Sequence, residues 1–387
     1  MTAPLVNSGE LTPWLGGALA PLQYRIRGRG FRGLSMTFEE VFSIEHLLDC
    51  ARECLSGVTW KQSAQMFEIN LLQWVATLHK DLMNGAYRSR GFNHFTICER
   101  GKRREISSVH ISERCVQKCL VKYALKPAIV PRLIYDNAAT IEGRGTEFAV
   151  KRLREHLRWH LARYGRTGGI LTVDYHNYFG SIDHDRLLSM LRQIIDDDQI
   201  FNLTVYFIRC FPGDFGLGLG SEISQISAVY YPNSIDHYMK DTLQVHGYAR
   251  YMDDSYAISE SLDALRDYRD VIARKSAEQG LQLNDKMTQI TRFDGGSFVY
   301  LKKRVFITPE HRIVMRLTPK NITQRRRGIK KQNILIAEGR MTPESRQQSF
   351  NSWRGYAEKY DSHTSVMRLE TMLNTGMGAL EGSNVST

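Results

Sequence analysis

The stretch that decides the fold reads Tyr248-Ala249-Arg250-Tyr251-Met252-Asp253-Asp254-Ser255-Tyr256-Ala257-Ile258. Aromatic and apolar residues flank two consecutive aspartates, which predicts a β-hairpin with Asp253 and Asp254 at its tip. Two carboxylates so close together are costly unless a cation compensates their charge. The ordinary alternative is a solvated turn, because aspartate is common in turns. The pair taken alone favours the solvated turn, so the rest of the chain has to decide.

A third aspartate, Asp174, ends the apolar run 169–173, as a metal ligand at the end of a strand does. Nucleotidyl transfer needs an activated 3′-oxygen and a neutralised pyrophosphate, and two metal ions about 3.5–4 Å apart can supply both. Mg²⁺ takes a few carboxylates together with substrate phosphates and water. We therefore expect Asp174, Asp253 and Asp254 to be the catalytic residues and to bind two Mg²⁺ ions, with Mn²⁺ as an alternative.

The charge balance of the 387 residues points to a polyanionic partner. Lys+Arg minus Asp+Glu is 52 − 41 = +11, and the sequence pI is about 9.3, which favours nucleic acid. No apolar run approaches the ~18 residues of a membrane span, and the N-terminus lacks a signal pattern, so we expect a cytoplasmic protein with no membrane partner. Six cysteines do not make a disulfide framework, and two pairs at i,i+4 spacing, Cys50/Cys54 and Cys115/Cys119, are predicted to be buried thiols on helix faces.

The remaining pattern alternates helices and strands without a dinucleotide-binding loop. The Gly-rich segment 216–220 precedes a helix, but no strand and ribose-binding acid accompany it. Helix 146–164 is basic on one face through Lys151, Arg152, Arg154, Arg158 and Arg163. The other predicted elements are helices over 36–90, a hairpin over 92–107, a helix over 113–130, a strand over 169–174, helices over 184–197, 222–245 and 261–279, two short strands reaching about 307, and a basic helical C-terminal region.

The sequence 251–254 after a strand resembles the YxDD signature of reverse transcriptases. Other landmarks of that family follow in the family's order, over about 90–360. They are 173–179 with 181–184 for the first palm motif, 220–225 for the second, 280–286 for the fourth, 298–304 for the primer-gripping fifth, 101–106 with Arg114 and 143–145 for the fingers, and 352–356 for a thumb motif of the bacterial branch. An ordered set of this length is too specific to be a chance likeness.

The resemblance implies an α+β right-hand polymerase fold. Its expected parts are an irregular basic N-terminal arm over 1–35, fingers with N-terminal helices over 36–168, and a palm over 169–307 whose antiparallel sheet carries the hairpin. A helical thumb over 308–387 completes the expected fold.

The resemblance also implies roles for residues that would bind the incoming nucleotide. Lys102 and Arg104 are expected to hold the triphosphate, because point charges and forked donors suit phosphate. Phe179 is expected to lie against the ribose and to exclude a 2′-hydroxyl. Gly220, Ser224 and Gln225 are expected to line the nucleotide and template pocket. The ordinary alternatives are a solvated hairpin face, a core aromatic residue and a packed helix start.

A second set of residues is expected to contact primer and template. Tyr251, Met252, Leu301 and Lys302 belong to the two motifs nearest the primer end. The C-terminal region adds a basic run whose side chains could contact phosphates across a folded RNA, with a solvated helix as the alternative. Its residues in this set are Arg325, Arg326 and Arg327.

Two positions depart from the family pattern. Leu219 stands where the second motif commonly has glutamine, so a polar contact that selects the nucleotide is absent. Met287 precedes Thr288 where the fourth motif often has lysine, and Lys286 lies one residue earlier. A general-acid role for Lys286 is therefore not assigned.

The kind of reverse transcriptase is narrowed by what the chain lacks room for. About 80 residues after the palm suffice for a thumb and leave no space for a ribonuclease H or endonuclease domain. The form of 220–225 and of 231–238 resembles defence-associated bacterial enzymes, whereas Leu219 also fits diversity-generating ones. Such enzymes use a dedicated structured non-coding RNA as template, with deoxynucleotides and a DNA product, and a homo-oligomer is compatible with either kind. The competing hypotheses are a polymerase-fold protein that only binds RNA, and untemplated extension by the same palm.

Overall fold

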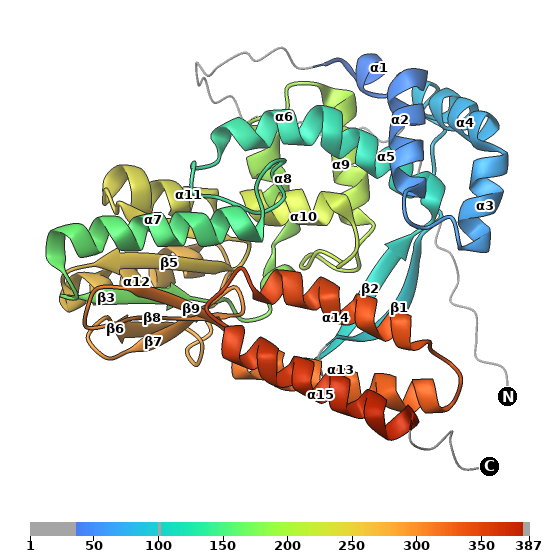
Figure 1. Cartoon of the computed structure of the whole chain (residues 1–387). Coiled ribbons are helices and arrows are strands. Elements are labelled where there is room, and N and C mark those ends of the chain that lie inside the picture. Colours follow the sequence, from blue (N-terminus) through green and yellow to red (C-terminus); the bar gives the residue numbers. More distant parts are fainter. Residues whose placement is uncertain (1–35, 100–101, 382–387) are drawn as a thin grey trace, which may run out of the picture.

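The computed structural model describes residues 36–99 and 102–381 (Figure 1). The predicted arm over 1–35 lies outside these residues. The described part begins with four helices whose apolar residues recur every three or four positions, so that each helix buries one face. In the second helix the buried residues are Leu47, Cys50, Ala51, Cys54 and Leu55. These helices are α1 (Phe38–Val41), α2 (Ile44–Leu55), α3 (Gln62–Ile69) and α4 (Leu71–Met83).

The predicted hairpin over 92–107 is confirmed as β1 (Phe92–Glu99) and β2 (Lys102–Val109), which pair in antiparallel register from Phe92↔Val109 to Glu99↔Lys102. It extends away from the N-terminal helices (Figure 1). Helix α5 (Ile111–Leu120) follows and continues through a π-turn (Val121–Leu125) into α6 (Lys126–Ile129) and a short 3-10 turn (Val130–Arg132).

The cysteine pairs are buried and free of disulfides, as predicted. Cys115 donates a hydrogen bond through Sγ to the carbonyl of Leu47 at 3.2 Å, and Cys119 donates to the carbonyl of Val41 at 2.9 Å. Both contacts join α5 to the first two helices. The four thiols therefore belong to the core that holds the fingers together.

The central sheet has the strand order β4-β5-β3-β6, and each neighbouring pair is antiparallel. Alternate residues of β3 point to opposite faces. Ile170 packs with α7 (Thr146–Tyr164), whereas Leu171 and Val173 pack with α12 (Leu262–Glu278). Helix α7 has the bounds that the sequence predicted, and α12 differs from its prediction by one residue at each end. The strands are β3 (Gly169–Val173), β4 (Gly247–Tyr251), β5 (Asp254–Ser259) and β6 (Gln289–Arg292).

The helix predicted over 184–197 ends early, at Arg192, and the helix predicted over 222–245 is divided. Asp197 accepts hydrogen bonds from the backbone amides of Gln199 and Ile200 and so begins a new helix. Pro232 follows the first half of the second region, where proline, having no N–H, cannot continue the helical bonding. The resulting helices are α8 (His184–Arg192), α9 (Asp198–Arg209), α10 (Glu222–Tyr230) and α11 (Asn233–His237), followed by a π-turn (Tyr238–Thr242).

A second sheet places one strand in a region that we expected to be helical. Strands β7 (Ser297–Tyr300), β8 (Lys303–Ile307) and β9 (Ile313–Leu317) form it in sequence order. The prediction assigned β9 to a helical thumb. The short segment is instead apolar and pairs with β8, so Val314, Met315 and Leu317 are buried, the last two in one core with residues of α7.

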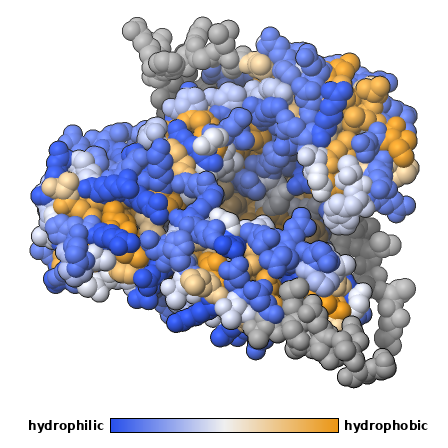
Figure 2. Space-filling model, viewed as in Figure 1, coloured by the Kyte–Doolittle hydropathy of each residue, from blue (hydrophilic) through white to orange (hydrophobic). Residues whose placement is uncertain are grey.

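Three helices complete the chain around a small core of Ile329, Phe350, Leu369 and Leu373. They are α13 (Pro319–Ala337), α14 (Pro343–Ala357) and α15 (His363–Glu381). Figure 2 shows a hollow between these helices and those of the fingers, with hydrophilic residues around it. Among the described helices, none is both long enough and apolar enough to cross a membrane.

Candidate active site

The two consecutive aspartates lie at the tip of a tight hairpin, as predicted. Tyr251 pairs with Asp254, so Met252 and Asp253 are the two turn residues between β4 and β5. Met252 has a φ of 57°, in the left-handed region, and Asp253 is not among the positive-φ residues. A positive φ at the first turn position alone is the pattern of a type II′ turn, whose twist suits a hairpin.

The third aspartate reaches the same edge through strand pairing. Val173 at the end of β3 pairs with Ser255 of β5. Continuing this antiparallel register by one residue sets Asp174 opposite Asp254. Burial, together with the charges of Asp253 and Asp174, raises the pKa of Asp254 to about 7. Burial is the largest cause of this rise, and the charges of Asp253 and Asp174 both add to it.

The carboxylates fit the divalent metal that the sequence implies, although they do not enclose it. Within residues 36–99 and 102–381, no three or more His, Cys, Asp or Glu side chains form a group that could hold a metal ion by itself. Mg²⁺ does not require such a cage, because it takes a few carboxylates and completes its shell with substrate phosphates and water. Like-charged carboxylates on two paired strands meet that requirement, and a divalent cation would relieve their repulsion.

Asp174 is held in place by the loop that follows α12. Asn284 donates from Nδ2 to Asp174 Oδ2 at 3.0 Å, and its backbone amide donates to the Asp174 carbonyl at 2.8 Å. The Thr288 hydroxyl lies 3.4 Å from both the amide and the carbonyl of Asp174. The sequence placed Asn284 in a motif but gave it no role at the site. The feature that pointed to this role was a short amide side chain within the segment 280–286, which resembles the fourth motif of the family.

Arg250 is the second residue whose role at the site was missed. Its side chain is buried, and Nη1 donates to the carbonyl of the turn residue Met252 at 3.0 Å. Nε and Nη2 donate to the carboxylate of Asp236 on α11, which also accepts a hydrogen bond from the Tyr248 hydroxyl. The feature that pointed to this role was a charged arginine within an otherwise apolar strand, because a buried charge requires a buried partner. The hairpin tip is thus tied to α11.

A second tight turn lies near the aspartates. Tyr300 pairs with Lys303, so Leu301 and Lys302 are the two turn residues between β7 and β8. Both have positive φ, 46° and 66°, which is the pattern of a type I′ turn. The positive charge of Lys302 acts on Asp254, where it opposes the rise in that carboxyl's pKa.

The segment expected to meet the ribose follows Asp174 directly. Phe179 lies in a short 3-10 turn (Tyr178–Ser181), is half-buried, and contacts the ring of Tyr178 edge-on at 5.7 Å between centroids. Its carbonyl accepts a hydrogen bond from the amide of Leu217 at 2.8 Å. The first palm motif is therefore fastened to the loop that leads into α10.

The same loop contacts the fingers strand β2. Gly220 has a φ of 112°, and a Cβ there would lie 3.2 Å from Cγ2 of Ile106. The amide of Ser107 donates to the carbonyl of Leu219 at 3.0 Å. Lys102 and Arg104 stand two residues apart on β2 and hence on one face of it, although their side chains lie outside the described part.

The residues predicted to line the nucleotide pocket differ in exposure at the first turn of α10. Ser221 begins the helix by accepting a hydrogen bond from the amide of Ser224. The Ser224 side chain is fully buried, and its hydroxyl has no partner among the described residues. Gln225 is exposed. Of the three predicted pocket residues, Gly220 and Gln225 therefore face solvent, whereas Ser224 does not.

The three arginines predicted to contact nucleic acid from the thumb also differ in exposure. Arg326 and Arg327 are exposed on α13. Arg325 instead turns toward α14, where Nη1 donates to the Ser349 hydroxyl at 3.3 Å and the guanidinium lies over the rings of Phe350 and Trp353. Burial lowers the pKa of Arg325. The expectation that all three arginines face nucleic acid is therefore corrected for Arg325, which packs within the thumb.

Fold and site together define the class of this protein. A palm sheet that gathers acidic residues at one edge, between fingers and a helical thumb, is the arrangement of a right-hand nucleic-acid polymerase. A family model described as reverse transcriptase (RNA-dependent DNA polymerase) matches residues 93–339, which is more than half of the chain. The chain belongs to the reverse transcriptase family, and its enzymatic class is RNA-directed DNA polymerase.

Solved structures of other proteins also resemble the chain, among them a telomerase. The chain is similar to a telomerase from Candida albicans whose structure was solved in complex with a TWJ fragment of telomeric RNA. The identity is 13%, the TM-score is 0.46, and the match covers 67% of this chain and 51% of the telomerase chain, so it spans about half of that protein. The family assignment rests on the family model and not on this likeness. No curated protein sequence matches the chain.

Proposed function

We propose that this protein copies RNA into DNA with Asp174, Asp253 and Asp254 as the ligands of two Mg²⁺ ions. The observation that carries the proposal is the meeting of the three carboxylates at one edge of the palm sheet, where burial and mutual repulsion raise the pKa of Asp254 to about 7. Bound metal would supply activation of the 3′-oxygen and neutralisation of the pyrophosphate.

The chain's own residues would then position the reactants. Asn284 fixes the orientation of the Asp174 carboxylate, and Arg250 fixes the hairpin through the Met252 carbonyl. Lys302 brings a positive charge to the edge where the primer end would lie. Phe179 is half-buried on the segment after Asp174, where its ring would exclude a 2′-hydroxyl. Such fixed geometry is what makes the reaction effectively unimolecular.

Other residues would contact the primer end, the nucleotide and the template. Tyr251, Met252 and Leu301 would bear on the primer end, and the exposed Gly220 and Gln225 on the nucleotide and template. The charged residues Lys102, Arg104, Arg326 and Arg327 would bind phosphates of the nucleotide and the template.

The experiment is primer extension by the double variant Asp253→Asn, Asp254→Asn. We expect DNA synthesis on an RNA template to be abolished while RNA binding, measured by gel shift, persists. The matched control is Asp263→Asn, Asp270→Asn, which removes two exposed carboxylates from α12 and should leave synthesis unchanged. Synthesis by the first variant at the wild-type rate would overturn the proposed mechanism.

For the finer function we propose a dedicated structured non-coding RNA as the template, in bacterial anti-phage defence. The net charge of +11, the exposed basic residues of α13 and the resemblance of 220–225 and 231–238 support it. A diversity-generating enzyme is the second candidate, favoured by Leu219. Sequencing the nucleic acid that co-purifies with the active protein tests both. One recurring RNA with its complementary DNA supports the proposal, whereas DNA without a template, or RNA of mixed origin, contradicts it.

A further inference from the structure

The basic face of α7 is divided by its partners. Arg152 is engaged in ion pairs with Asp136 and Glu155, and Arg163 lies over the ring of Trp159 at 4.3 Å. Arg154 and Arg158 have no ion pair in the part of the chain that the structure describes. Arg154 donates through Nε to Met315 Sδ at 3.2 Å, which is a weak acceptor and leaves the positive charge uncompensated.

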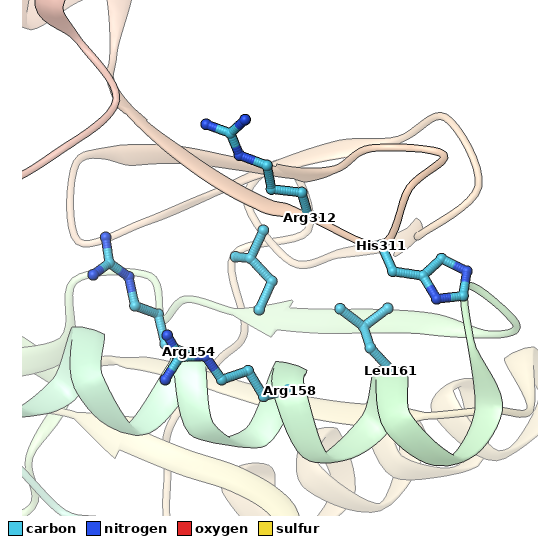
Figure 3. Close-up of a pocket in the computed structure, with 6 residues that line it drawn as sticks. Arg154, Arg158, Leu161, His311 and Arg312 are labelled. Atoms are coloured by element: carbon cyan, nitrogen blue, oxygen red, sulfur yellow. The ribbon is translucent and has the colours of Figure 1, made fainter.

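These two arginines line a cavity of about 480 Å³ between α7 and the turn that joins β8 to β9 (Figure 3). Arg154 and Arg158 project from the helix, and Arg312 projects from the facing turn. Arg312 likewise has no ion pair among the described residues. None of the lining residues is acidic. The full lining is Arg154, Arg158, Leu161, His311, Arg312 and Ile313.

The cavity continues along the helix. A second cavity of about 280 Å³ shares Arg154 and Arg158 and adds Lys151. Its two acidic residues are already engaged, Glu147 by Lys359 and Glu155 by Arg152. Two cavities with an excess of positive charge therefore lie next to each other along the outer side of α7, and together they are called the basic groove.

The two walls of the groove are held by one core. Leu161 of α7 and Met315 of β9 belong to the same buried cluster, and Ile313 packs against it. Within the turn, the amide of Thr308 donates to the carbonyl of Arg312 and the amide of His311 donates to the carbonyl of Thr308, both at 3.0 Å. Guanidinium groups on a fixed turn and a packed helix lose less freedom on binding than those on a mobile loop.

The groove lies away from the catalytic edge. Its inner end is near Gly165, where a Cβ would lie 3.4 Å from the ring of His311. The chain then enters β3 at Gly169, whereas Asp174 follows the other end of that strand. Five strand residues span roughly 16 Å. The groove and the aspartates therefore lie toward opposite ends of β3.

We infer that this groove binds the phosphodiester backbone of an RNA that extends beyond the catalytic cleft. Guanidinium forks match phosphate oxygens, and three of them on facing walls suit several phosphates of one polymer. The lining offers few groups able to read bases, so we expect recognition by backbone and shape. The inference extends the proposed function to a second site, and the proposed function does not depend on it.

The test compares two triple variants of the full chain. Arg154→Ala, Arg158→Ala, Arg312→Ala empties the groove of its arginines. The control, Arg266→Ala, Arg269→Ala, Arg274→Ala, removes the same charge from exposed positions of α12, which packs on the other face of the sheet. The probes are a short RNA–DNA hybrid and the same hybrid continued into a long folded RNA stem.

We expect the groove variant to lose affinity for the long probe by about tenfold. The magnitude of the slope of log K against log salt should fall by about 2.7, since three phosphate contacts are lost and each contributes about 0.9. Extension of the short hybrid should stay near the wild-type rate. A salt slope equal to that of the α12 control would overturn the inference. So would binding of inorganic phosphate or ATP that the long RNA fails to displace, because the groove would then be a small-anion site.

The outcomes keep the two proposals apart. Failure of the wild-type protein to extend the short hybrid contradicts the proposed function. The salt dependence of binding to the long probe can still be compared between the groove variant and the α12 control. Equal salt slopes for the groove variant and the α12 control contradict RNA binding in the groove. The extension assay still tests the proposed function in that case. The variant Arg154→Lys, Arg158→Lys, Arg312→Lys, which keeps the charge, should recover much of the slope and shows that a loss in the alanine variant is not a folding defect.

Discussion

The two ends of strand β3 gather opposite charges. At one end lie Asp174, Asp253 and Asp254, and burial together with the charges of the other two raises the pKa of Asp254. At the other end three guanidinium groups line a cavity without an acidic residue in its wall. Like charges held close together raise the free energy of a site, and a bound partner of the opposite sign relieves that cost. The contrast supports both proposals, in which metal ions bind at one end of the palm sheet and phosphates at the other.

The largest effect is expected from removing the arginine that fixes the carboxylate end. Arg250→Met leaves the buried Asp236 carboxylate unpaired, which costs about 3–5 kcal/mol of unfolding free energy. DNA synthesis should be lost with it. Denaturant unfolding and primer extension measure the two effects.

The double variant Arg250→Met, Asp236→Leu separates stability from positioning. Replacing both members of a buried pair by apolar residues is often neutral for stability, so the unfolding free energy should recover. Synthesis should stay low, because the Met252 carbonyl still lacks its donor. Full recovery of synthesis would mean that Arg250 acts on stability alone.

A smaller loss is expected at Asn284. Asn284→Ala removes a hydrogen bond to the Asp174 carboxylate, and such bonds to charged groups contribute about 1.5–3 kcal/mol. The rate of synthesis should fall by roughly tenfold, and the Mg²⁺ concentration for half-maximal rate should rise. The matched control is Asn351→Ala, which removes the same amide group from an exposed position of α14 and should change neither quantity. A rate change without a shift in the Mg²⁺ dependence would argue against the assigned role.

Phe179 tests selectivity at the carboxylate end. Phe179→Ala should raise ribonucleotide incorporation relative to deoxynucleotide incorporation by roughly tenfold, since relief of a small steric clash is worth about 1–3 kcal/mol. Competition assays with one ribonucleotide at a time measure the ratio. Phe179→Tyr keeps the ring and should keep the selectivity. An unchanged ratio in the alanine variant would remove Phe179 as the gate.

The smallest effect is expected at the edge of the basic groove. Glu147→Gln removes the carboxylate that pairs with Lys359 on the surface. Surface pairs contribute little to stability, so unfolding should not change. Affinity for the long folded RNA should rise by about twofold, because one repelling charge beside the groove is gone. A fall in affinity would place the bound RNA elsewhere.

Local patterns in the sequence were sufficient for much of the fold. The alternation around Asp253 and Asp254 predicted the hairpin, and the spacing of apolar residues predicted α7 and α12. The strand β9 was missed because periodicity alone cannot distinguish a five-residue apolar segment from part of a helix, although Pro309 marks the turn before it. The start of α9 after Asp197 and the break at Pro232 are likewise local features, and their capping and breaking signals were present in the sequence.

Contacts between segments that are distant in the chain could not be predicted from the sequence. Arg250 meets Asp236 across 14 residues, and Asn284 meets Asp174 across 110. The basic face of α7 looked uniform until the structure showed that Asp136 occupies Arg152 and leaves Arg154 without an ion pair among the described residues. The roles of these residues depend on which partner lies opposite, and residue type alone does not determine that.

The pair formed by Arg250 and Asp236 also bears on descent. Losing either residue alone leaves a charge in the interior, so a lineage that changes one position has to change the other soon after or lose the protein. The two positions should therefore vary together among relatives, as one inherited character. The helix α11 and the catalytic hairpin would then share a single evolutionary history, although 14 residues separate the two side chains that join them.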